Sequence, residues 1–201
     1  PFSTAAVVPS DHEVESLPGL PEGAFSTRHY AGHIPVRDAE SFTFYWLFES
    51  AGQPDSDPIV IWLNGGPGCS SMDGLWLENG PFRLDGQHHI TVNPYRHDIP
   101  VLWHKKSNLL YVDQPLGTGL SFTTNKDYAD NDLEVNDLFY EFLLKFMGLH
   151  PSFRSRVGSE EALYRSRPIF FAGESHAGHY IPSMVAHVLR KNKELMSGQV
   201  M

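Results

Sequence analysis

The chain has 201 residues, of which 41% are hydrophobic and 19% are charged, and this composition is typical of one folded domain with a sizeable core. The net charge of −9 argues against nucleic acid or an anionic membrane as a partner, and the apolar stretches are strand-sized, too short to span a membrane. The 11 histidines are scattered without ligand spacing, so the sequence predicts no metal site and no cofactor.

The first part of the chain predicts an arm followed by two antiparallel strands. Up to Pro21 the chain is rich in Pro, Ser and acidic residues, which is typical of an extended segment. Two strand-like segments, Arg28–Val36 and Ser41–Glu49, flank a short polar link. Aromatic residues take alternate positions in the second of them: Phe42, Phe44, Trp46 and Phe48. This period of two residues favours an antiparallel pair with an aromatic face in the core.

Three further strands are predicted from apolar runs. Ile59–Leu63, Leu109–Val112 and Pro168–Ala172 are continuously apolar, as expected of strands that are buried on both faces. Gly80–Ser107 is rich in Pro, Asn and His and is predicted to be mostly loop.

Two helices are predicted between and after these strands. Asn131–Met147 has helical periodicity, with apolar residues at Leu133, Leu138, Phe142, Leu143 and Phe146. A second helix is expected over Pro182–Leu195, with Pro182 at its first position, where a missing N–H costs nothing. Strands that alternate with helices and long loops predict an α/β protein with a mostly parallel sheet.

The pattern Gly-x-Ser-x-Gly follows the third of these strands, at Gly173 to Gly178. An apolar strand, this pattern and then a helix are typical of a nucleophile elbow, which holds a serine at the apex of a sharp turn. We expect Ser175 to be exposed there, and the N–H of His176 to point toward a developing oxyanion. Side chains at Gly173 and Gly178 would obstruct the turn or the approach of helix to strand.

A second glycine-rich loop, Gly65 to Gly68, comes directly after the strand Ile59–Leu63. Acyl transfer needs a second oxyanion donor, and α/β-hydrolases place it on a loop after an earlier strand. The loop is too short for a Walker phosphate site and lacks its lysine, so nucleotide binding is not favoured.

Three motifs together resemble the serine carboxypeptidases, the lysosomal and vacuolar family of α/β-hydrolase fold. They are Trp62–Ser71 (WLNGGPGCSS), Asp113–Gly119 (DQPLGTG) and Gly173–Pro182 (GESHAGHYIP). Leu17–Pro21 and Tyr30–Ile34 match the N-terminal segment of this family as well. The resemblance implies an α/β-hydrolase fold, of which this chain holds the N-terminal portion of a mostly parallel central sheet with flanking helices.

The family resemblance also implies roles for individual residues. Ser175 matches the acyl-forming nucleophile, and the N–H groups of Gly66 and His176 match the oxyanion hole. The cluster that holds the free carboxylate of the substrate matches Trp62, Asn64, Gly65, Glu78 and Glu174.

The implied pair of Glu78 and Glu174 has a physical consequence. Two carboxyl groups held together cannot both ionise cheaply, so one is expected to keep its proton at acidic pH and to donate a hydrogen bond to the substrate carboxylate. Substrate binding is then expected to weaken as the pH rises.

Three other polar residues are not expected to complete a triad. His179 lies on the same helical segment as the serine. Asp113 precedes Ser175, whereas α/β-hydrolase triads run Ser, Asp/Glu, His, so we expect Asp113 to shape the active-site loop. His176 stands where the family usually has tyrosine, which is expected to alter the pocket for the residue before the scissile bond.

The resemblance implies that residues 1–201 are the N-terminal portion of the domain, with the later strands, the cap insertion and the triad Asp and His outside this chain. A companion C-terminal chain is one explanation of this, and a truncated gene product or a partial sequence are others. In the family the cysteine that matches Cys69 pairs with a later cysteine, so the resemblance implies an oxidising compartment: the secretory pathway, with the lysosome, the vacuole or secretion as destinations.

The sequence therefore predicts a serine-type carboxypeptidase that releases C-terminal residues from peptides and proteins through an acyl-enzyme, best at acidic pH. Two alternatives stay open. One is a non-catalytic binding or regulatory chain that retains only this part of the fold. The other is an acyltransferase on the same scaffold, which would need an alcohol acceptor.

Overall fold

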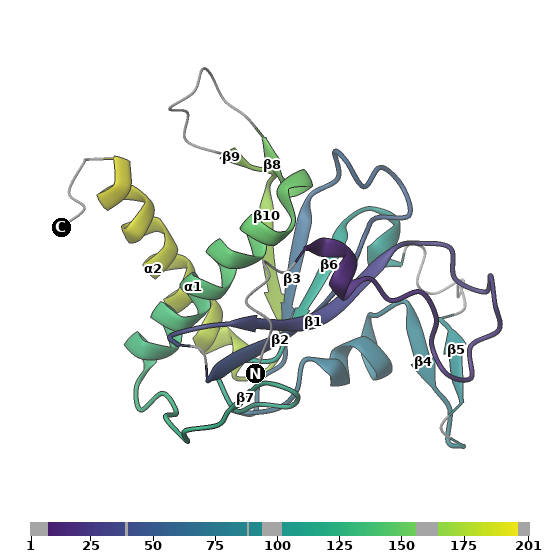
Figure 1. The fold of residues 1–201 in the computed structure, drawn as a ribbon, viewed down its shortest axis with the longest axis horizontal. Coiled ribbons are helices and arrows are strands. Elements are labelled where there is room, and N and C mark those ends of the chain that lie inside the picture. Colours follow the sequence, from purple (N-terminus) through teal and green to yellow (C-terminus); the bar gives the residue numbers. More distant parts are fainter. Residues whose placement is uncertain (1–7, 39, 88, 94–101, 156–164, 197–201) are drawn as a thin grey trace.

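A computed structural model of the protein describes residues 8–38, 40–87, 89–93, 102–155 and 165–196. Its centre is a sheet in the order β1-β2-β6-β3-β10, with β7 paired to β2 (Figure 1). These strands are β1 (His29–Pro35), β2 (Ser41–Phe48), β3 (Ile59–Leu63), β6 (Asn108–Val112), β7 (Phe122–Thr123) and β10 (Ile169–Gly173). β1, β2 and β6 pair antiparallel, whereas β6, β3 and β10 are parallel. The sheet is therefore mixed, with a parallel part formed by β6, β3 and β10 and the predicted antiparallel pair of β1 and β2.

Helices and short strands surround this sheet. The helices are α1 (Asp132–Leu149), α2 (Ala177–Met196), the π-helix η2 (Gly74–Glu78) and the 3₁₀ turns η1 (Pro9–His12), η3 (Trp103–Lys105) and η4 (Pro151–Phe153). Two small antiparallel pairs are β4 (Phe82–Leu84) with β5 (Ile90–Val92) and β8 (Arg154–Ser155) with β9 (Arg165–Ser166). The hairpin β4–β5 corrects the prediction that Gly80–Ser107 is mostly loop for the described part of that segment. The N-terminal arm contains η1 and is not extended throughout.

The sheet buries a different cluster on each face. Leu110 and Val112 pack with α1 and α2 in one cluster, whereas Leu109 and Tyr111 pack with η2 and the β4–β5 hairpin in the other. Figure 1 shows the two long helices on the same side of the sheet. Both faces of the central strands are thus covered, which explains why these strands are continuously apolar.

The predicted helix Asn131–Met147 is confirmed as α1. Asn131 caps it, because its side-chain oxygen accepts a hydrogen bond from the N–H of Glu134 at 3.1 Å, and such a cap satisfies one of the free donors of the first turn. The expected apolar face is buried except for Leu133, which is 55% exposed. Leu133 lies in the first turn of α1 and does not contribute to that buried face.

The second helix begins five residues earlier than predicted, at Ala177, so that Pro182 lies inside α2. The prediction of Pro182 at the first helical position is therefore wrong. The helix starts directly after the elbow, where the N–H groups of Ala177 and Gly178 donate to the carbonyls of Glu174 and Ser175. Pro182 removes one hydrogen bond of the early helix, and the packing of α2 on the sheet outweighs this loss.

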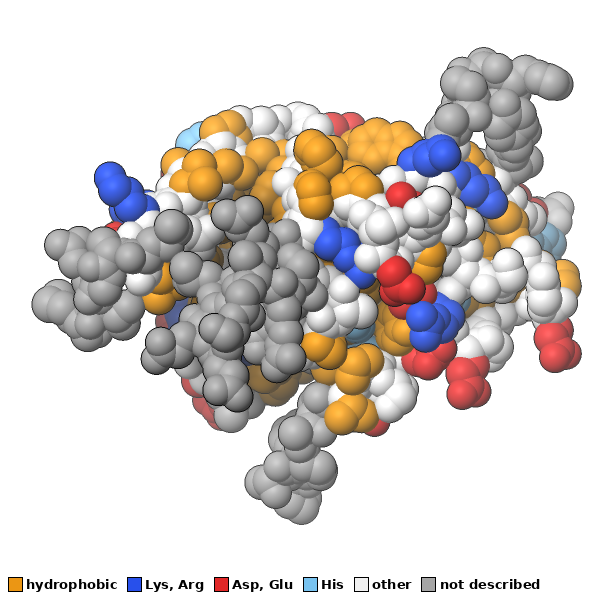
Figure 2. Space-filling model, turned by 90° about the horizontal axis from the view of Figure 1, so that it is seen from above, with side chains coloured by type: hydrophobic (Ala, Val, Ile, Leu, Met, Phe, Trp, Pro, Cys, Tyr) orange, Lys and Arg blue, Asp and Glu red, His pale blue; other side chains and the backbone are white. Residues whose placement is uncertain are grey.

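Large apolar side chains stay exposed at several places in the described chain. Phe170 on β10 is 56% exposed and Leu189 on α2 is 63% exposed. Figure 2 shows one face of the molecule, on which apolar side chains are spread between charged ones. None of the helices in the described ranges has both the length and the apolar character needed to cross a membrane.

Candidate active site

The turn from β10 to α2 has the geometry of a nucleophile elbow. Ser175 adopts a left-handed backbone conformation, with φ of +55°, which is unusual for a residue other than glycine and is found at functional sites. A side chain on Gly173 would overlap the carbonyl oxygen of Leu63 and would stand 2.7 Å from Cβ of Ala177. Gly173 is thus required by the close approach of strand and helix, as expected.

Gly178 does not have the role predicted for it. A Cβ atom on Gly178 would meet nothing within 4 Å in the described chain. Both glycines belong to the sequence motif, but only Gly173 lies between the strand and the helix.

The glycine loop lies against this elbow because its strand is the neighbour of β10. β3 and β10 are parallel, with Leu63 opposite Gly173, and the carboxyl ends of parallel strands meet at one edge of a sheet. A Cβ on Gly65 would stand 2.5 Å from the backbone nitrogen of His176. Gly66 has φ of +104°, a conformation that favours glycine. The loop and the start of α2 therefore bring backbone N–H groups of both segments close to Ser175.

The Asn64 side chain connects the residues that were predicted to hold a substrate carboxylate. Asn64 is 3% exposed, and its Oδ1 accepts hydrogen bonds from Trp62 Nε1 at 2.6 Å and from the N–H of Gly74 at 3.2 Å. Its Nδ2 donates to Oε1 of Glu78 and to Oε1 of Glu174, each at 3.2 Å. One amide thus brings together a carboxylate from η2 and a carboxylate from the elbow, although they are far apart in the sequence.

Sequence reasoning missed the glycine that this arrangement requires. A side chain on Gly74 would overlap Nε1 of Trp62 and stand 2.7 Å from Oδ1 of Asn64. No glycine pattern marks this position, since it is an isolated residue ten positions after Asn64. Only the packing of η2 against β3 shows its importance.

The remaining candidates occupy defined places. His179 Nε2 lies 2.9 Å from a carboxylate oxygen of Asp132 in α1, and the ring of His176 packs on those of His179 and Tyr180, with centroids 5.1 and 4.8 Å apart. Cys69 is a free and exposed thiol. In the described part of the chain, no group of three or more His, Cys, Asp or Glu side chains could hold a metal ion.

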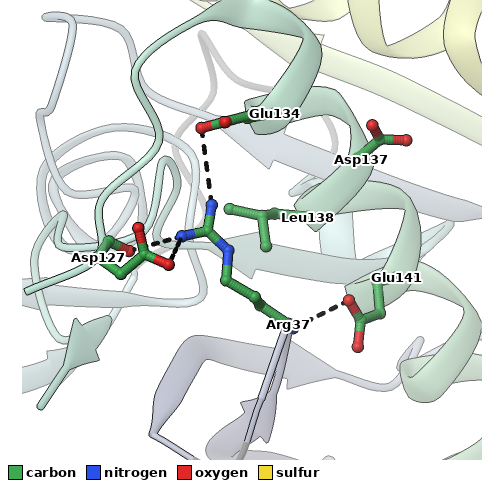
Figure 3. Close-up of a pocket in the computed structure, with 6 residues that line it drawn as sticks. All are labelled: Arg37, Asp127, Glu134, Asp137, Leu138 and Glu141. Carbon is green, nitrogen blue, oxygen red and sulfur yellow. Dashed lines mark hydrogen bonds and ion pairs between the residues drawn. The ribbon is translucent and has the colours of Figure 1, made fainter. Parts of the chain in front are cut away.

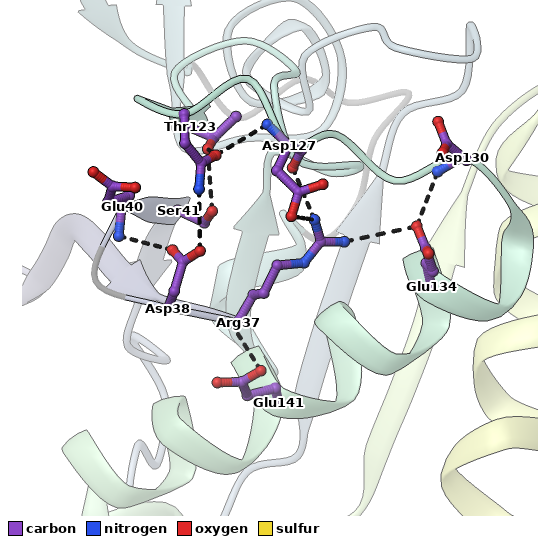
Figure 4. A network of polar contacts seen from close by, with 10 residues as sticks. Arg37, Asp38, Glu40, Ser41, Thr123, Asp127, Asp130, Glu134 and Glu141 are labelled. Carbon is purple, nitrogen blue, oxygen red and sulfur yellow. Dashed lines mark hydrogen bonds and ion pairs between the residues drawn. The ribbon is translucent and has the colours of Figure 1, made fainter.

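A pocket of about 370 Å³ is lined by other residues, from α1, the turn after β1 and the segment that precedes α1 (Figure 3). The Arg37 guanidinium lies 2.5 Å from Asp127 and 3.7 Å from Glu134, and the backbone N–H of Arg37 donates to Glu141 at 2.9 Å (Figure 4). Asp137 lies 3.5 Å from Lys191. These carboxylates are paired within the protein, and the contacts of Arg37 hold the turn after β1 against α1.

Arg37 itself has φ of +60°, which gives a stability prediction. We expect Arg37→Ala to lower the free energy of unfolding by about 1–2 kcal/mol, since it loses the ion pairs and keeps the left-handed strain. Arg37→Gly should be about 1 kcal/mol more stable than Arg37→Ala, because glycine adopts this conformation freely. Urea denaturation measures the difference. A glycine variant less stable than the alanine variant would show that strain at Arg37 is not significant.

Comparisons with known proteins agree with this geometry. A family model described as serine carboxypeptidase matches residues 18–200. The pheromone-processing carboxypeptidase KEX1 of Phytophthora infestans (strain T30-4) is 42% identical over 186 residues, which cover 92% of this chain and 30% of the relative. The lysosomal protective protein of Mus musculus is 39% identical over 184 residues, which cover 90% of this chain and 35% of the relative.

A solved structure gives the same result. The crystal structure of Kex1(delta)p, a prohormone-processing carboxypeptidase from Saccharomyces cerevisiae, matches with a TM-score of 0.74 at 33% identity. The match covers 94% of this chain and 40% of that one. The α/β-hydrolase fold is therefore confirmed, and the chain spans about a third of the length of the curated relatives named above.

Proposed function

Because this chain belongs to the serine carboxypeptidase family, we propose that it carries the nucleophile of an enzyme that releases C-terminal residues from peptides and proteins. Ser175 Oγ attacks the carbonyl carbon of the last peptide bond and gives its proton to a general base. The C–N bond breaks, the departing amino acid takes a proton on its nitrogen, and an acyl-enzyme remains. Water then hydrolyses this ester and restores the serine. The N–H groups of Gly66 and His176 stabilise the oxyanion of both steps.

The observation that carries the exopeptidase assignment is the Asn64 amide, which joins Glu78 and Glu174 next to Ser175. Trp62 holds Asn64 in place, and the N–H of Gly65 lies beside the elbow. A protonated Glu at this site would donate a hydrogen bond to the terminal carboxylate of the substrate. When both ionise, they repel that carboxylate. We therefore expect activity to be highest at acidic pH.

The general base and its acidic partner come from sequence outside this chain, in a companion chain or in a longer form of the same protein. Two observations support this proposal. The chain spans about a third of its curated relatives, and β10 lies at one end of the strand order with Phe170 56% exposed. We place residues 1–201 at the N-terminal side of the domain, with Cys69 bonded to a cysteine of the absent part. The protein then works in the secretory pathway, in lysosomes, in vacuoles or after secretion.

A fluorophosphonate probe read by intact mass under non-reducing conditions tests this proposal. A single adduct that is absent from Ser175→Ala shows an activated serine and a complete site, and the mass shows whether a second chain is joined through Cys69. Turnover with an alcohol acceptor but not with peptides would indicate an acyltransferase. No adduct on a lone chain of 201 residues would favour a non-catalytic binding role for that form.

The carboxyl pair gives a second test, in KM measured between pH 5 and 7.5. For a peptide with a free C-terminus we expect KM to rise tenfold or more once both carboxyl groups are ionised, because the lost hydrogen bond to a charged group contributes about 1.5–3 kcal/mol. Glu78→Gln and Glu174→Gln should each flatten the rise, because glutamine stays neutral and still donates.

Two controls accompany this experiment. Glu22 is an exposed carboxylate of the N-terminal segment, and Glu22→Gln should leave the rise of KM unchanged. The C-terminal amide of the same peptide lacks the carboxylate and should show no rise. If both glutamine variants keep the full rise, the pair does not recognise the terminal carboxylate.

A further inference from the structure

A buried carboxylate lies between the glycine loop and the loop that follows β6. Asp113 follows β6 and is 0% exposed. Its Oδ1 accepts hydrogen bonds from the hydroxyl of Ser70 at 2.7 Å and from the N–H of Ser71 at 2.8 Å. Its Oδ2 accepts from the N–H of Leu120 at 2.9 Å. Both oxygens of Asp113 therefore accept hydrogen bonds, and their donors come from separate loops.

The serine side of this arrangement leads directly to the glycine loop. The hydroxyl of Ser71 donates to the carbonyl of Val112 at 2.6 Å and accepts a hydrogen bond from the N–H of Asn64 at 3.1 Å. Asn64 is followed by Gly65 and Gly66. A displacement of Ser70 and Ser71 would therefore move both ends of the loop that carries the Gly66 N–H.

The opposite side of the carboxylate is closed by glycine. A side chain on Gly119 would overlap Oδ2 of Asp113 and would stand 2.7 Å from Oγ of Ser70. A proton added to the carboxylate would face the N–H of Leu120 or Ser71, unless it is directed at the hydroxyl of Ser70, which would then have to accept instead of donate. The observed hydrogen bonds thus match the ionised form.

We propose that Asp113 is a positioning residue whose ionised carboxylate holds the glycine loop against the elbow, so that its protonation, together with that of the general base, limits activity at acidic pH. This inference rests on the proposed function, since it concerns the donor that Gly66 supplies to the same reaction. It predicts a loss of activity on the acidic side of the pH optimum. On the basic side, the loss would come from ionisation of both Glu78 and Glu174.

The groups around Asp113 raise or lower its pKa, so that substitutions can shift this limit. Burial raises the pKa of the Asp113 carboxyl, and hydrogen bonds from Leu120, Ser70 and Ser71 offset part of that rise. Asp73, on the segment before η2, is the charged group that faces it and raises the pKa further. The loop on the other side contributes the Leu120 N–H and Gly119, which carry no charge.

In the active enzyme that contains this chain, kcat plotted against pH should fall on the acidic side, and we call this fall the acidic limb. Two variants should move the acidic limb in opposite directions. Ser70→Ala removes a donor to the carboxylate and should shift the limb to higher pH. Asp73→Asn removes a negative charge and should shift it to lower pH, each by roughly half a unit to one unit. In Asp113→Asn an N–H group would face one of these donors at every pH, so kcat should fall about tenfold to a hundredfold and the acidic limb should no longer respond to Ser70→Ala or Asp73→Asn.

A control variant and a measurement that does not depend on catalysis distinguish this positioning role from an effect on stability alone. Asn108 is also 0% exposed, lies at the other end of β6 and accepts from the N–H of Ser50 at 3.0 Å. Asn108→Ala should lower stability without moving the limb. In the 201-residue chain the Ser71 and Leu120 amide proton shifts should titrate together with the acidic limb. A limb that stays in place in Ser70→Ala and Asp73→Asn, or amides that do not titrate there, would overturn the inference. Amides that titrate in a protein without turnover at any pH would overturn the proposed function alone.

Discussion

Gly65→Ala should lower kcat about a hundredfold or more, in line with the loss of one oxyanion donor. The added Cβ would stand 2.5 Å from the backbone nitrogen of His176 and 2.9 Å from the carbonyl oxygen of Glu174. Both are backbone atoms of the elbow and cannot rotate away, so the loop itself must move. That movement separates the N–H of Gly66 from the N–H of His176, which bind the same oxygen on the proposed function. Steady-state kinetics with a peptide substrate measures the effect.

Gly178→Ala is the control for this prediction, since the described chain leaves the space around Gly178 open. We expect its kcat to stay within about twofold, and its stability to be equal or higher by up to about 1 kcal/mol, because alanine favours a helix. Equal losses in the two variants would mean that the contact between Gly65 and the elbow does not position the oxyanion donors.

The free energy of unfolding should fall by about 8 kcal/mol between pH 7 and pH 4. His29, His104 and His150 are 7%, 2% and 4% exposed, and burial lowers the pKa of each to about 4. In the unfolded chain these pKa values lie near 6.5. The unfolded state therefore binds more protons between these values, so stability is complete above pH 6.5 and is lost as the pH falls toward 4. Each histidine contributes up to about 3 kcal/mol.

Denaturant unfolding at several pH values measures this loss. His104 has an Nδ1 atom without a hydrogen-bond partner in the described structure, so His104→Phe should remove about a third of the pH dependence at little cost. His89 has a side chain that is 66% exposed, and His89→Gln should change nothing. A stability that stays flat from pH 7 to pH 4 would show that these histidines are solvated. On the proposed function, the enzyme is most active where it is less stable.

Local patterns predicted the parts of the site that lie next to each other in the sequence. The apolar run before Gly-x-Ser-x-Gly required a buried strand, and the elbow follows from the tight turn that these residues allow. The glycine loop was predicted to supply the second oxyanion donor, because α/β-hydrolases place that donor on a loop after an earlier strand. In the same way, alternation in β2 identified Phe44, Trp46 and Phe48 as core residues, and they are buried. Phe42 is only partly buried and stacks on Phe122, with ring centroids 5.0 Å apart.

The sequence by itself thus determined the α/β class, the long strands of the sheet and the elbow, because their signals are short-range periodicities and spacings, and the resemblance to a known family indicated the candidate residues. Tertiary structure alone decided the contacts between distant segments: the Asn64 amide between Glu78 and Glu174, the space that only Gly74 leaves, and the donors around Asp113. It also decided where α2 begins, since packing against the sheet outweighs the preference of Pro182. These outcomes depend on free energies of burial and hydrogen bonding between segments that meet only in the folded chain.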